Sequence, residues 1–417
     1  LHRRRHSFPT RRSSDLRINK MLETRIAKEL AYISQAGLAR RITELYFVNP
    51  AQAQDRTGKT YLVLASNNYL GFTHAPEVIE AASRAALKFG TGSSGSRLTT
   101  GGTFIASELE KRLADFKHSE SALVFNTGYM TNLGILYGLL QTGDVVFSDE
   151  LNHASIIDGC RISRCKVVVY KHNDMADLQR LLETEIVTGQ RFIVTDGVFS
   201  MDGDIADLPS LAVLKKQFNA FLIVDDAHGV GVIGNDGSGT ASHYGLTDVI
   251  DLQVGTLSKA LAAEGGYVAG KKILIDYLIN RSRPFIFSTA LAPATLAAAN
   301  AALLLLQTQA SKYLDSLRAN SRLMRRLLLE GGLNVVEGIT PIIPVVIGEA
   351  GLTMQFADRL KSKGILVSGI RPPTVPRGES RLRITVTAAH CEEQLRQAAQ
   401  IITALWQELK HGEKKEG

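Results

Sequence analysis

The chain has 417 residues, of which 45% are hydrophobic and 21% charged, and its formal net charge is +7. This length suits two domains, and the composition is that of a globular protein rather than a disordered one. The longest apolar run, residues 291–306, is too short to span a bilayer, so we expect no membrane segment. The three cysteines show neither metal-ligand nor redox spacing, so we expect no metal site and a cytoplasmic location.

Residues 1–16 (LHRRRHSFPTRRSSDL) share no periodicity with the rest of the chain and resemble a translated sequencing-adapter read-through. We expect this segment to be non-native and the genuine start to be Met21. A real basic arm for nucleic acid, or a transit peptide, is the competing interpretation. The segment supplies five arginines and one aspartate, which is +4 of the net +7. The mild charge that remains gives little support to a nucleic-acid partner, and we expect none.

Three further regions are expected along the chain. Residues 17–65 are predicted to form an N-terminal helical arm, because residues 20–42 have helical periodicity. Residues 66–295 are predicted to form a large domain, in which short unbroken runs rich in valine and isoleucine alternate with helical stretches. Such runs are typical of strands buried on both faces of a mostly parallel sheet. They are residues 121–125, 144–148, 166–170, 191–195, 221–226, 251–256 and 265–270. Residues 296–417 are predicted to form a smaller C-terminal α/β domain.

Three of the predicted strands end in, or are followed by, residues that suggest chemistry. Gly128 and Tyr129 follow one strand and begin a helix, where free backbone N–H groups favour a phosphate. Asp225 ends the run FLIVDD, and His228 comes three residues later. Lys259, in GTLSKA, stands among small and apolar residues just past another strand. Each has a plain alternative: a β–α connection, a structural Asp–His turn, or a lysine whose amine reaches solvent.

The combination favours chemistry over the plain alternatives. A lysine that loses solvation has a lowered pKa, so its neutral amine becomes nucleophilic. A buried carboxylate needs a cationic partner. A phosphate site, a buried acid and a desolvated lysine at the strand ends of one sheet are what a pyridoxal phosphate site requires.

Nearly the whole chain, from about residue 36 to 405, resembles the α-oxoamine synthase family, which consists of fold-type I enzymes that use pyridoxal 5'-phosphate. The resemblance implies a mostly parallel central sheet flanked by helices, a smaller C-terminal α/β domain and a homodimer with shared active sites. The motifs that carry it occur in the family's order: SNNYLG (66–71), GTGSSGSRLTTGG (90–102), FNTGYMTN (125–132), DELNHASIIDG (149–159), TDGVFSMDGD (195–204), VDDAHGVG (224–231), GTLSKA (255–260), FSTAL (287–291) and RPPTVPRGESRLRIT (371–385).

The resemblance also implies roles for single residues. Lys259 would form the imine with the cofactor, Asp225 would pair with the pyridinium, and His228 would hydrogen-bond the phenolic oxygen. His153 would stack on the ring and Ser200 would support the ring oxygen. The phosphate would be held by three residues of the same chain and one of the neighbouring subunit: Gly128, Tyr129, Thr256 and, across the interface, Thr289.

Substrate residues are implied in the same way. The resemblance makes Asn67 and His153 substrate-binding residues. The alternation in RLRITVT puts Arg381 and Arg383 on one face, and the family assigns the substrate carboxylate to the arginine aligned with Arg383. A solvated strand face is the alternative. Arg371 and Thr374 in IRPPTVPRG, with Arg40, would contact the substrate.

The implied reaction is a decarboxylative condensation of an amino acid with an acyl thioester. The segment IRPPTVPRG favours the branch of biotin synthesis, which joins L-alanine to a pimeloyl group carried by CoA or acyl carrier protein. Asp196, where many members of that branch have glutamate, points instead to the glycine and acetyl-CoA branch, and Ala106 replaces a frequent histidine. A catalytically silent partner subunit is an alternative of another class, and the presence of Lys259 argues against it.

Overall fold

The computed structural model describes residues 13–36, 38–40 and 42–416, and the chain divides into two compact units, residues 1–45 and 46–417, each described by itself. The first unit contains the helix α1 (Ser13–Gln35). This helix confirms part of the predicted periodic stretch 20–42, but it ends earlier. Residues 1–12 of the predicted adapter segment lie outside the described residues. Among the described helices, none combines the length and apolarity needed to cross a bilayer.

The stretch 46–63 contains three short strands and no helix. This corrects the prediction that the helical arm extends to residue 65. The strands are β1 (Tyr46–Asn49), β2 (Gln52–Gln54) and β3 (Thr60–Val63). A tight turn joins β2 to β3, in which the Asp55 carboxylate accepts hydrogen bonds from the backbone N–H groups of Thr57 and Lys59. Such turns, with Gly58 at a positive φ of 83°, close antiparallel hairpins. The strand β3 also pairs in parallel with β12 (Ile365–Leu366) of the later chain.

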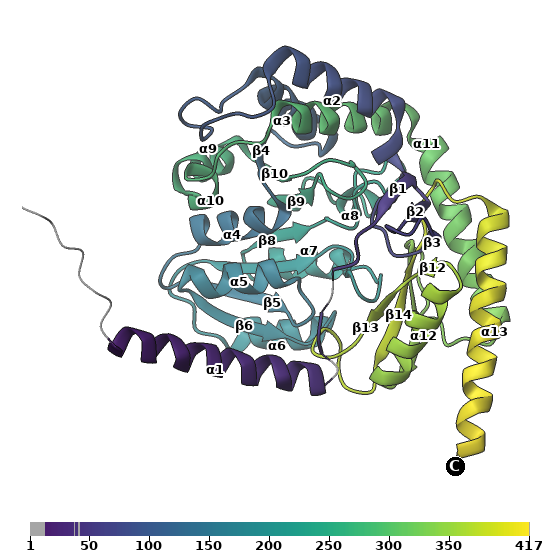
Figure 1. The fold of residues 1–417 in the computed structure, drawn as a ribbon. Coiled ribbons are helices and arrows are strands. Elements are labelled where there is room, and N and C mark those ends of the chain that lie inside the picture. The colour runs from purple at the N-terminus through teal and green to yellow at the C-terminus, as the bar shows by residue number, and fades with distance from the viewer. Residues whose placement is uncertain (1–12, 37, 41, 417) are drawn as a thin grey trace, which may run out of the picture. The chain divides into compact units, whose positions relative to one another are not determined.

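A seven-stranded sheet with the order β4-β10-β9-β8-β7-β5-β6 forms the centre of the second unit (Figure 1). Its strands are β4 (Ser121–Phe125), β5 (Val145–Asp149), β6 (Lys166–Tyr170), β7 (Arg191–Asp196), β8 (Ala220–Asp225), β9 (Leu252–Thr256) and β10 (Gly266–Gly270). All seven predicted strands are thus confirmed. The strand β10 runs opposite to the other six strands of this sheet. The edge strand β6 exposes Val167 and Val169, which lie on one face, and buries Val168 and Tyr170 on the other, so the predicted burial on both faces is wrong for this strand.

Helices flank this sheet and connect its strands. They are η1 (Phe72–His74), α2 (Pro76–Phe89), α3 (Phe104–Phe116), α4 (Gly128–Leu139), α5 (Ala154–Ser163), α6 (Met175–Thr184), α7 (Leu208–Gln217), α8 (Thr240–His243), α9 (Lys272–Arg281) and α10 (Arg283–Ile286). The long helix α11 (Pro293–Glu330) packs against α2 and α3 at the top of Figure 1 and has a non-helical residue at Gln309.

The last part of the chain builds a second, smaller sheet of order β11-β14-β13. It consists of β11 (Ile342–Gly348), β13 (Ser368–Ile370) and β14 (Ser380–Thr385), with the helices α12 (Ala350–Ser362) and α13 (Glu392–Glu416). This sheet and its helices agree with the α/β composition predicted for residues 296–417. The boundary predicted between residues 295 and 296 falls in the first turn of α11 and stays a prediction.

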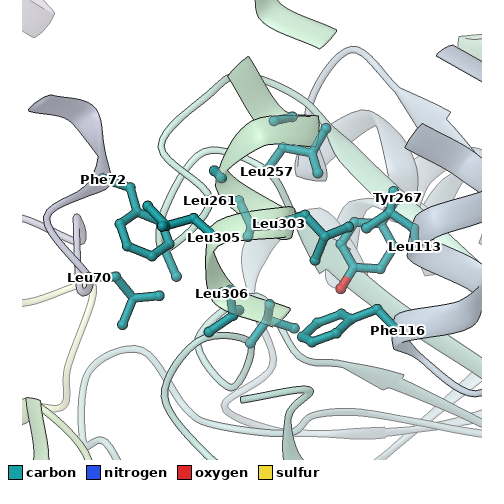
Figure 2. Packing of buried hydrophobic residues seen from close by; sticks show 14 of the residues in the cluster. Leu70, Phe72, Leu113, Phe116, Leu257, Leu261, Tyr267, Leu303, Leu305 and Leu306 are labelled. Atoms are coloured by element: carbon teal, nitrogen blue, oxygen red, sulfur yellow. The ribbon is translucent and has the colours of Figure 1, made fainter. Parts of the chain in front are cut away.

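A hydrophobic core cluster with aliphatic and aromatic side chains packs around the segment that carries Lys259. Figure 2 shows Leu257 and Leu261, from the segment around Lys259, packed beside Leu303 of α11 and Tyr267 of β10. Leu257, Leu261 and Leu303 are fully buried. Burying a side chain of this size contributes about 1.5–3 kcal/mol. The segment that carries Lys259 is therefore anchored on both sides of the lysine.

Candidate functional site

The predicted site residues gather at the carboxyl ends of the central strands, where open α/β sheets bind ligands. Asp196 and Asp225 are the last residues of β7 and β8 and lie opposite each other in the sheet register. Thr256 ends β9, and Lys259 follows it in the next turn. His153 directly precedes α5.

The N-terminus of α4 lies against the end of β9. A side chain on Gly128 would place its Cβ 3.4 Å from Thr256 Oγ1, and a Cβ on Gly266 would come within 2.7 Å of the Gly128 backbone. Two glycines thus let the helix approach the sheet closely. The Thr127 side chain accepts a hydrogen bond from Met130 N at 3.0 Å and caps the helix. The next backbone N–H groups, with the helix dipole, form a cradle that suits a phosphate.

Asp225 is a buried carboxylate held by neutral donors. Its Oδ2 accepts a hydrogen bond from Asn132 Nδ2 at 2.6 Å and its Oδ1 accepts one from Ala227 N at 2.9 Å. Asn132 also donates to Ser155 Oγ at 2.9 Å, which fixes the amide orientation. Within the described chain, no lysine, arginine or histidine forms an ion pair with Asp225. A buried carboxylate without a cation fits a ligand that brings a positive charge.

The adjacent Asp226 has a different role. Its carboxylate lies 3.2 Å from Lys117 Nζ in an ion pair whose side chains are at most 2% exposed. It also accepts hydrogen bonds from the Thr240 backbone N and hydroxyl. A cationic partner was predicted for the buried acid, and this partner, Lys117, pairs with Asp226. Asp225 therefore remains available to a ligand.

Asp196 and His153 form the neighbouring part of the site. Asp196 Oδ2 accepts a hydrogen bond from His153 N at 2.9 Å. Burial and the nearby Asp225 carboxylate raise the pKa of Asp196 well above its usual value. Burial lowers the pKa of His153, and Lys259 adds to this effect against the attraction of Asp225. The His153 imidazole is therefore neutral near pH 7, and its ring lies edge-on to Tyr129 at 6.4 Å between centroids.

His228 is fixed from the other side of the site. Its Nδ1 lies 2.6 Å from the hydroxyl of the fully buried Tyr69. Burial, together with the positive charges of Lys259 and Arg383, lowers the pKa of His228 well below its usual value. A neutral imidazole with one nitrogen engaged by Tyr69 has its other nitrogen available for a ligand oxygen.

Lys259 has the lowered pKa that its surroundings predict. Burial lowers the pKa of Lys259 to about 8, although Asp225 and Asp196 attract the charged form. Its amine forms no hydrogen bond or ion pair with the described residues. Nearby, Thr256 Oγ1 hydrogen-bonds Ser258 Oγ at 2.8 Å and donates to Gly265 O at 2.9 Å, which holds the turn in place. The lowered pKa supports the prediction that this half-buried lysine is partly desolvated.

The two arginines of β14 differ in what neutralises them. Arg381 forms ion pairs with Asp202 and with Glu379, the latter at 3.0 Å. Arg383 is also buried, but the acceptors around it are neutral: the Ser200 carbonyl, Asn67 Oδ1 at 3.2 Å and Thr385 Oγ1 at 3.0 Å.

Both arginines point to the turn 200–202, as the alternation predicts. Arg383 therefore has its charge available for a substrate carboxylate, and Arg381 does not. This difference supports the choice between them that the family resemblance implied.

Thr374 lies beside this turn. It lines a cavity of about 300 Å³ together with Ser200, Phe199, Met201 and Val375. The structure thus brings Thr374 next to Ser200. Among the other predicted substrate residues, Arg371 and Arg383 do not line this cavity.

Arg40 belongs to the unit 1–45, which is described by itself, so its predicted contact with substrate stays a prediction. Arg371 is half-buried, and its backbone carbonyl accepts a hydrogen bond from Thr374 N. Thr289 is exposed, and its carbonyl accepts a hydrogen bond from Asn126.

Sequence reasoning missed three residues of this site. Asn132 stands in the quoted motif FNTGYMTN, but its link to Asp225 spans 93 positions. Tyr69 stands in SNNYLG and reaches His228 across 159 positions. Lys117 carried no signal, because a lysine at the end of a helix ordinarily lies in solvent.

Comparison with known proteins places the chain in a family. Residues 59–402 match the family model of aminotransferase class I and II. An 8-amino-7-oxononanoate synthase of Lysinibacillus sphaericus is 47% identical over 374 residues, which cover 90% of this chain and 96% of that protein. One of Trichlorobacter lovleyi is 50% identical over 385 residues, which cover 92% and 98%.

A solved structure extends the likeness to the fold. A variant serine palmitoyltransferase from S. paucimobilis, with a bound PLP–myriocin aldimine, is 31% identical and superposes with a TM-score of 0.87. The match covers 92% of this chain and 97% of that one. The predicted family resemblance and the predicted fold-type I transferase fold are confirmed. The chain therefore belongs to the aminotransferase class I and II family.

Proposed function

We propose that the chain condenses L-alanine with a pimeloyl thioester to give 8-amino-7-oxononanoate, CO2 and the free thiol carrier, a step of biotin synthesis. The observation that carries the chemistry is the juxtaposition of Lys259, Asp225 and the N-terminus of α4 at one sheet edge. The observation that carries the substrate is the name shared by relatives that are 47% and 50% identical over nearly the whole chain.

The residues present fit pyridoxal 5'-phosphate as cofactor. Asp225, which lacks a cation of its own, would hold the protonated ring nitrogen, and His228 would hydrogen-bond the phenolic oxygen, which Ser200 would support. The neutral His153 would stack on the ring without adding charge. The phosphate would be held by Gly128, Tyr129 and Thr256, with Thr289 of a second subunit. When bound, this cofactor withdraws electrons from the amino acid α-carbon and so stabilises the carbanion formed there.

Lys259 moves the proton. With a pKa of about 8, its amine is neutral in about one molecule in ten at pH 7 and in about half at pH 8, and the neutral amine can accept the α-proton of alanine. The α-carbon then forms a bond to the thioester carbonyl carbon, and the thiolate leaves. The resulting β-keto acid loses its carboxylate as CO2, and Lys259 returns a proton to the same carbon. Asp196 and Asp225 attract the charged form of the amine and so assist the first transfer.

Arg383 orients the amino acid. Its guanidinium fork matches the substrate carboxylate, and Asn67 holds the fork in place through one oxygen that accepts from both terminal nitrogens. Thr374 would contact the acyl donor from the cavity beside Ser200. Arg371 and Arg40 are proposed to contact the substrate as well. A homodimer that shares Thr289 across its interface, located in the cytoplasm, completes the proposal.

One cross-assay tests the substrate. Purified protein loaded with pyridoxal phosphate is given alanine or glycine with pimeloyl-CoA or acetyl-CoA, and both free thiol and product mass are followed. We expect alanine with pimeloyl-CoA to be preferred. Asp196 favours the alternative, glycine C-acetyltransferase activity, and a preference for glycine with acetyl-CoA would establish it instead. Absence of turnover with every pair would favour a silent partner subunit.

A further inference from the structure

A second cavity lies outside the site described above. It measures about 360 Å³ and lies between α11, the loop after β8 and the turn before β11. Its charged lining consists of Arg318, Arg322 and Arg325, with His243 from the end of α8. No aspartate or glutamate lines it. The cavity therefore concentrates positive charge on one wall.

The helix α11 presents the three arginines together. They stand at spacings of four and three residues, which place them on one face of a helix. Ser321, on the same face, is buried and hydrogen-bonds the Leu317 carbonyl of its own helix. The opposite wall comes from backbone around Gly234 and Gly338. A Cβ on Gly338 would lie 3.6 Å from Arg325 Nη2, so the glycine leaves the guanidinium uncovered.

Arg325 is a half-buried cation without an anion among the described residues. Its guanidinium donates to the carbonyls of Val336, Thr340 and Ile342, the last two at 3.3 and 3.1 Å. Carbonyl oxygens hold a cation in place but do not neutralise it, and burial lowers the pKa of Arg325. A desolvated cation of this kind is stabilised when an anion enters.

The positive charges of the two other arginines are compensated weakly or not at all by the described residues. Arg318 donates to the Gly234 carbonyl at 2.6 Å, and the carboxylate near it, Asp315, lies 3.6 Å away with a side chain that is 72% exposed. Exposed pairs of this kind contribute little. Arg322 is exposed and makes no hydrogen bond or ion pair within the described part of the chain. Three guanidinium groups thus face one cavity with a single weak counter-charge.

We propose that this cavity binds a phosphate-bearing ligand with more than one negative charge. A single carboxylate needs one guanidinium fork, whereas a diphosphate or a phosphomonoester has the oxygens and charge to engage three. The volume lies within the range of small-molecule sites. The ligand is either a free phosphate compound or the phosphate-bearing end of a CoA thioester. The second source rests on the proposed function.

The test uses the protein with its pyridoxal phosphate bound, so that the phosphate cradle at α4 is filled. Pyrophosphate and CoA are titrated separately by calorimetry at constant ionic strength. The variant R322A removes a lining charge, and R326A is the matched control. Arg326 lies on the same helix but not in the cavity, and it has Glu330 as an exposed partner at 3.8 Å.

We expect R322A to weaken binding at least tenfold and R326A to change it less than twofold. If both ligands depend on Arg322 and compete, the site takes the phosphate end of CoA. If pyrophosphate alone depends on it, the site takes a free phosphate compound. The inference is overturned if pyrophosphate does not bind saturably, or if R322A binds as tightly as the control. Both readouts are independent of turnover, so failure of the proposed reaction leaves them unchanged.

Discussion

Replacing each arginine of β14 by leucine separates a structural role from a substrate-binding role. Arg381 is neutralised by Asp202 and Glu379, whereas Arg383 faces neutral acceptors in the described structure. R381L leaves Asp202 with its side chain only 25% exposed and without its cation. Arg381 is buried but its acidic partners are partly exposed, so the loss of these charged hydrogen bonds costs about 1.5–3 kcal/mol of unfolding free energy. R383L removes a cation that neutralises no acid, so its cost in stability is smaller, about 1–2 kcal/mol.

Catalysis is expected to show the reverse order. A hydrogen bond to a charged group contributes about 1.5–3 kcal/mol, so R383L loses roughly 10- to 150-fold in kcat/KM for the amino acid. R383K keeps the charge without the fork and recovers part of this loss. R381L, measured where it is folded, stays within about threefold of the unchanged protein.

The assays are urea unfolding for stability and initial rates at varied amino acid concentration for kcat/KM. The thioester is held saturating, so that changes report on the amino acid. If R381L lowers kcat/KM for alanine more than R383L does, the assignment of the substrate carboxylate to Arg383 is wrong. Equal stability losses for the two variants would refute the reasoning about their different neutralisation.

Two further predictions rest on single contacts. N132L removes one of the two donors to Asp225, so we expect kcat to fall about 10- to 100-fold. We also expect dialysis to show that the variant retains pyridoxal phosphate less well. Unchanged retention would argue against Asp225 as the partner of the ring nitrogen. Burial lowers the pKa of His172, but its hydrogen bonds to Asp149 and Asp204, at 3.0 and 2.9 Å, prevail and raise it to about 10. The contacts of protonated His172 with the two aspartates stabilise the fold fully below the unfolded pKa of histidine, about 6.5. This contribution to the free energy of unfolding is lost as the pH rises through 10. The deficit of H172Q in urea unfolding, roughly 3 kcal/mol at pH 6, should therefore shrink by pH 10; a deficit that grows with pH would contradict the sign.

The central sheet could be predicted from sequence because its signal is local. Runs such as RFIVT and FLIVDD are short, apolar and followed by polar residues, which is what a strand buried in a parallel sheet requires. The hairpin at residues 46–63 was missed because β2 is three residues long and its strand character depends on pairing with β3 and β12. Strands of this length carry too little periodicity to be recognised.

The site was predictable where strand ends alone decide it, and not where distant partners do. An acid at the end of FLIVDD and Lys259 after the next strand follow from their places in the sequence, whereas the role of Thr256 came only from the family resemblance. Nothing local distinguishes Asp225 from Asp226, since the distinction depends on Lys117, more than a hundred positions earlier.

The two arginines of β14 pose the same difficulty. Sequence alternation puts Arg381 and Arg383 on one face, and only the three-dimensional positions of Asp202 and Glu379 show which of the two is already neutralised.

The proposed chemistry depends above all on Lys259 as the residue that links covalently to pyridoxal phosphate. The most direct measurement is reduction of the loaded protein with borohydride, followed by proteolysis and mass spectrometry of the labelled peptide. We predict a single pyridoxyl group on Lys259, within GTLSKA, and no label in K259A, which also loses turnover. A label on another lysine, or substantial turnover by K259A, would contradict this role of Lys259.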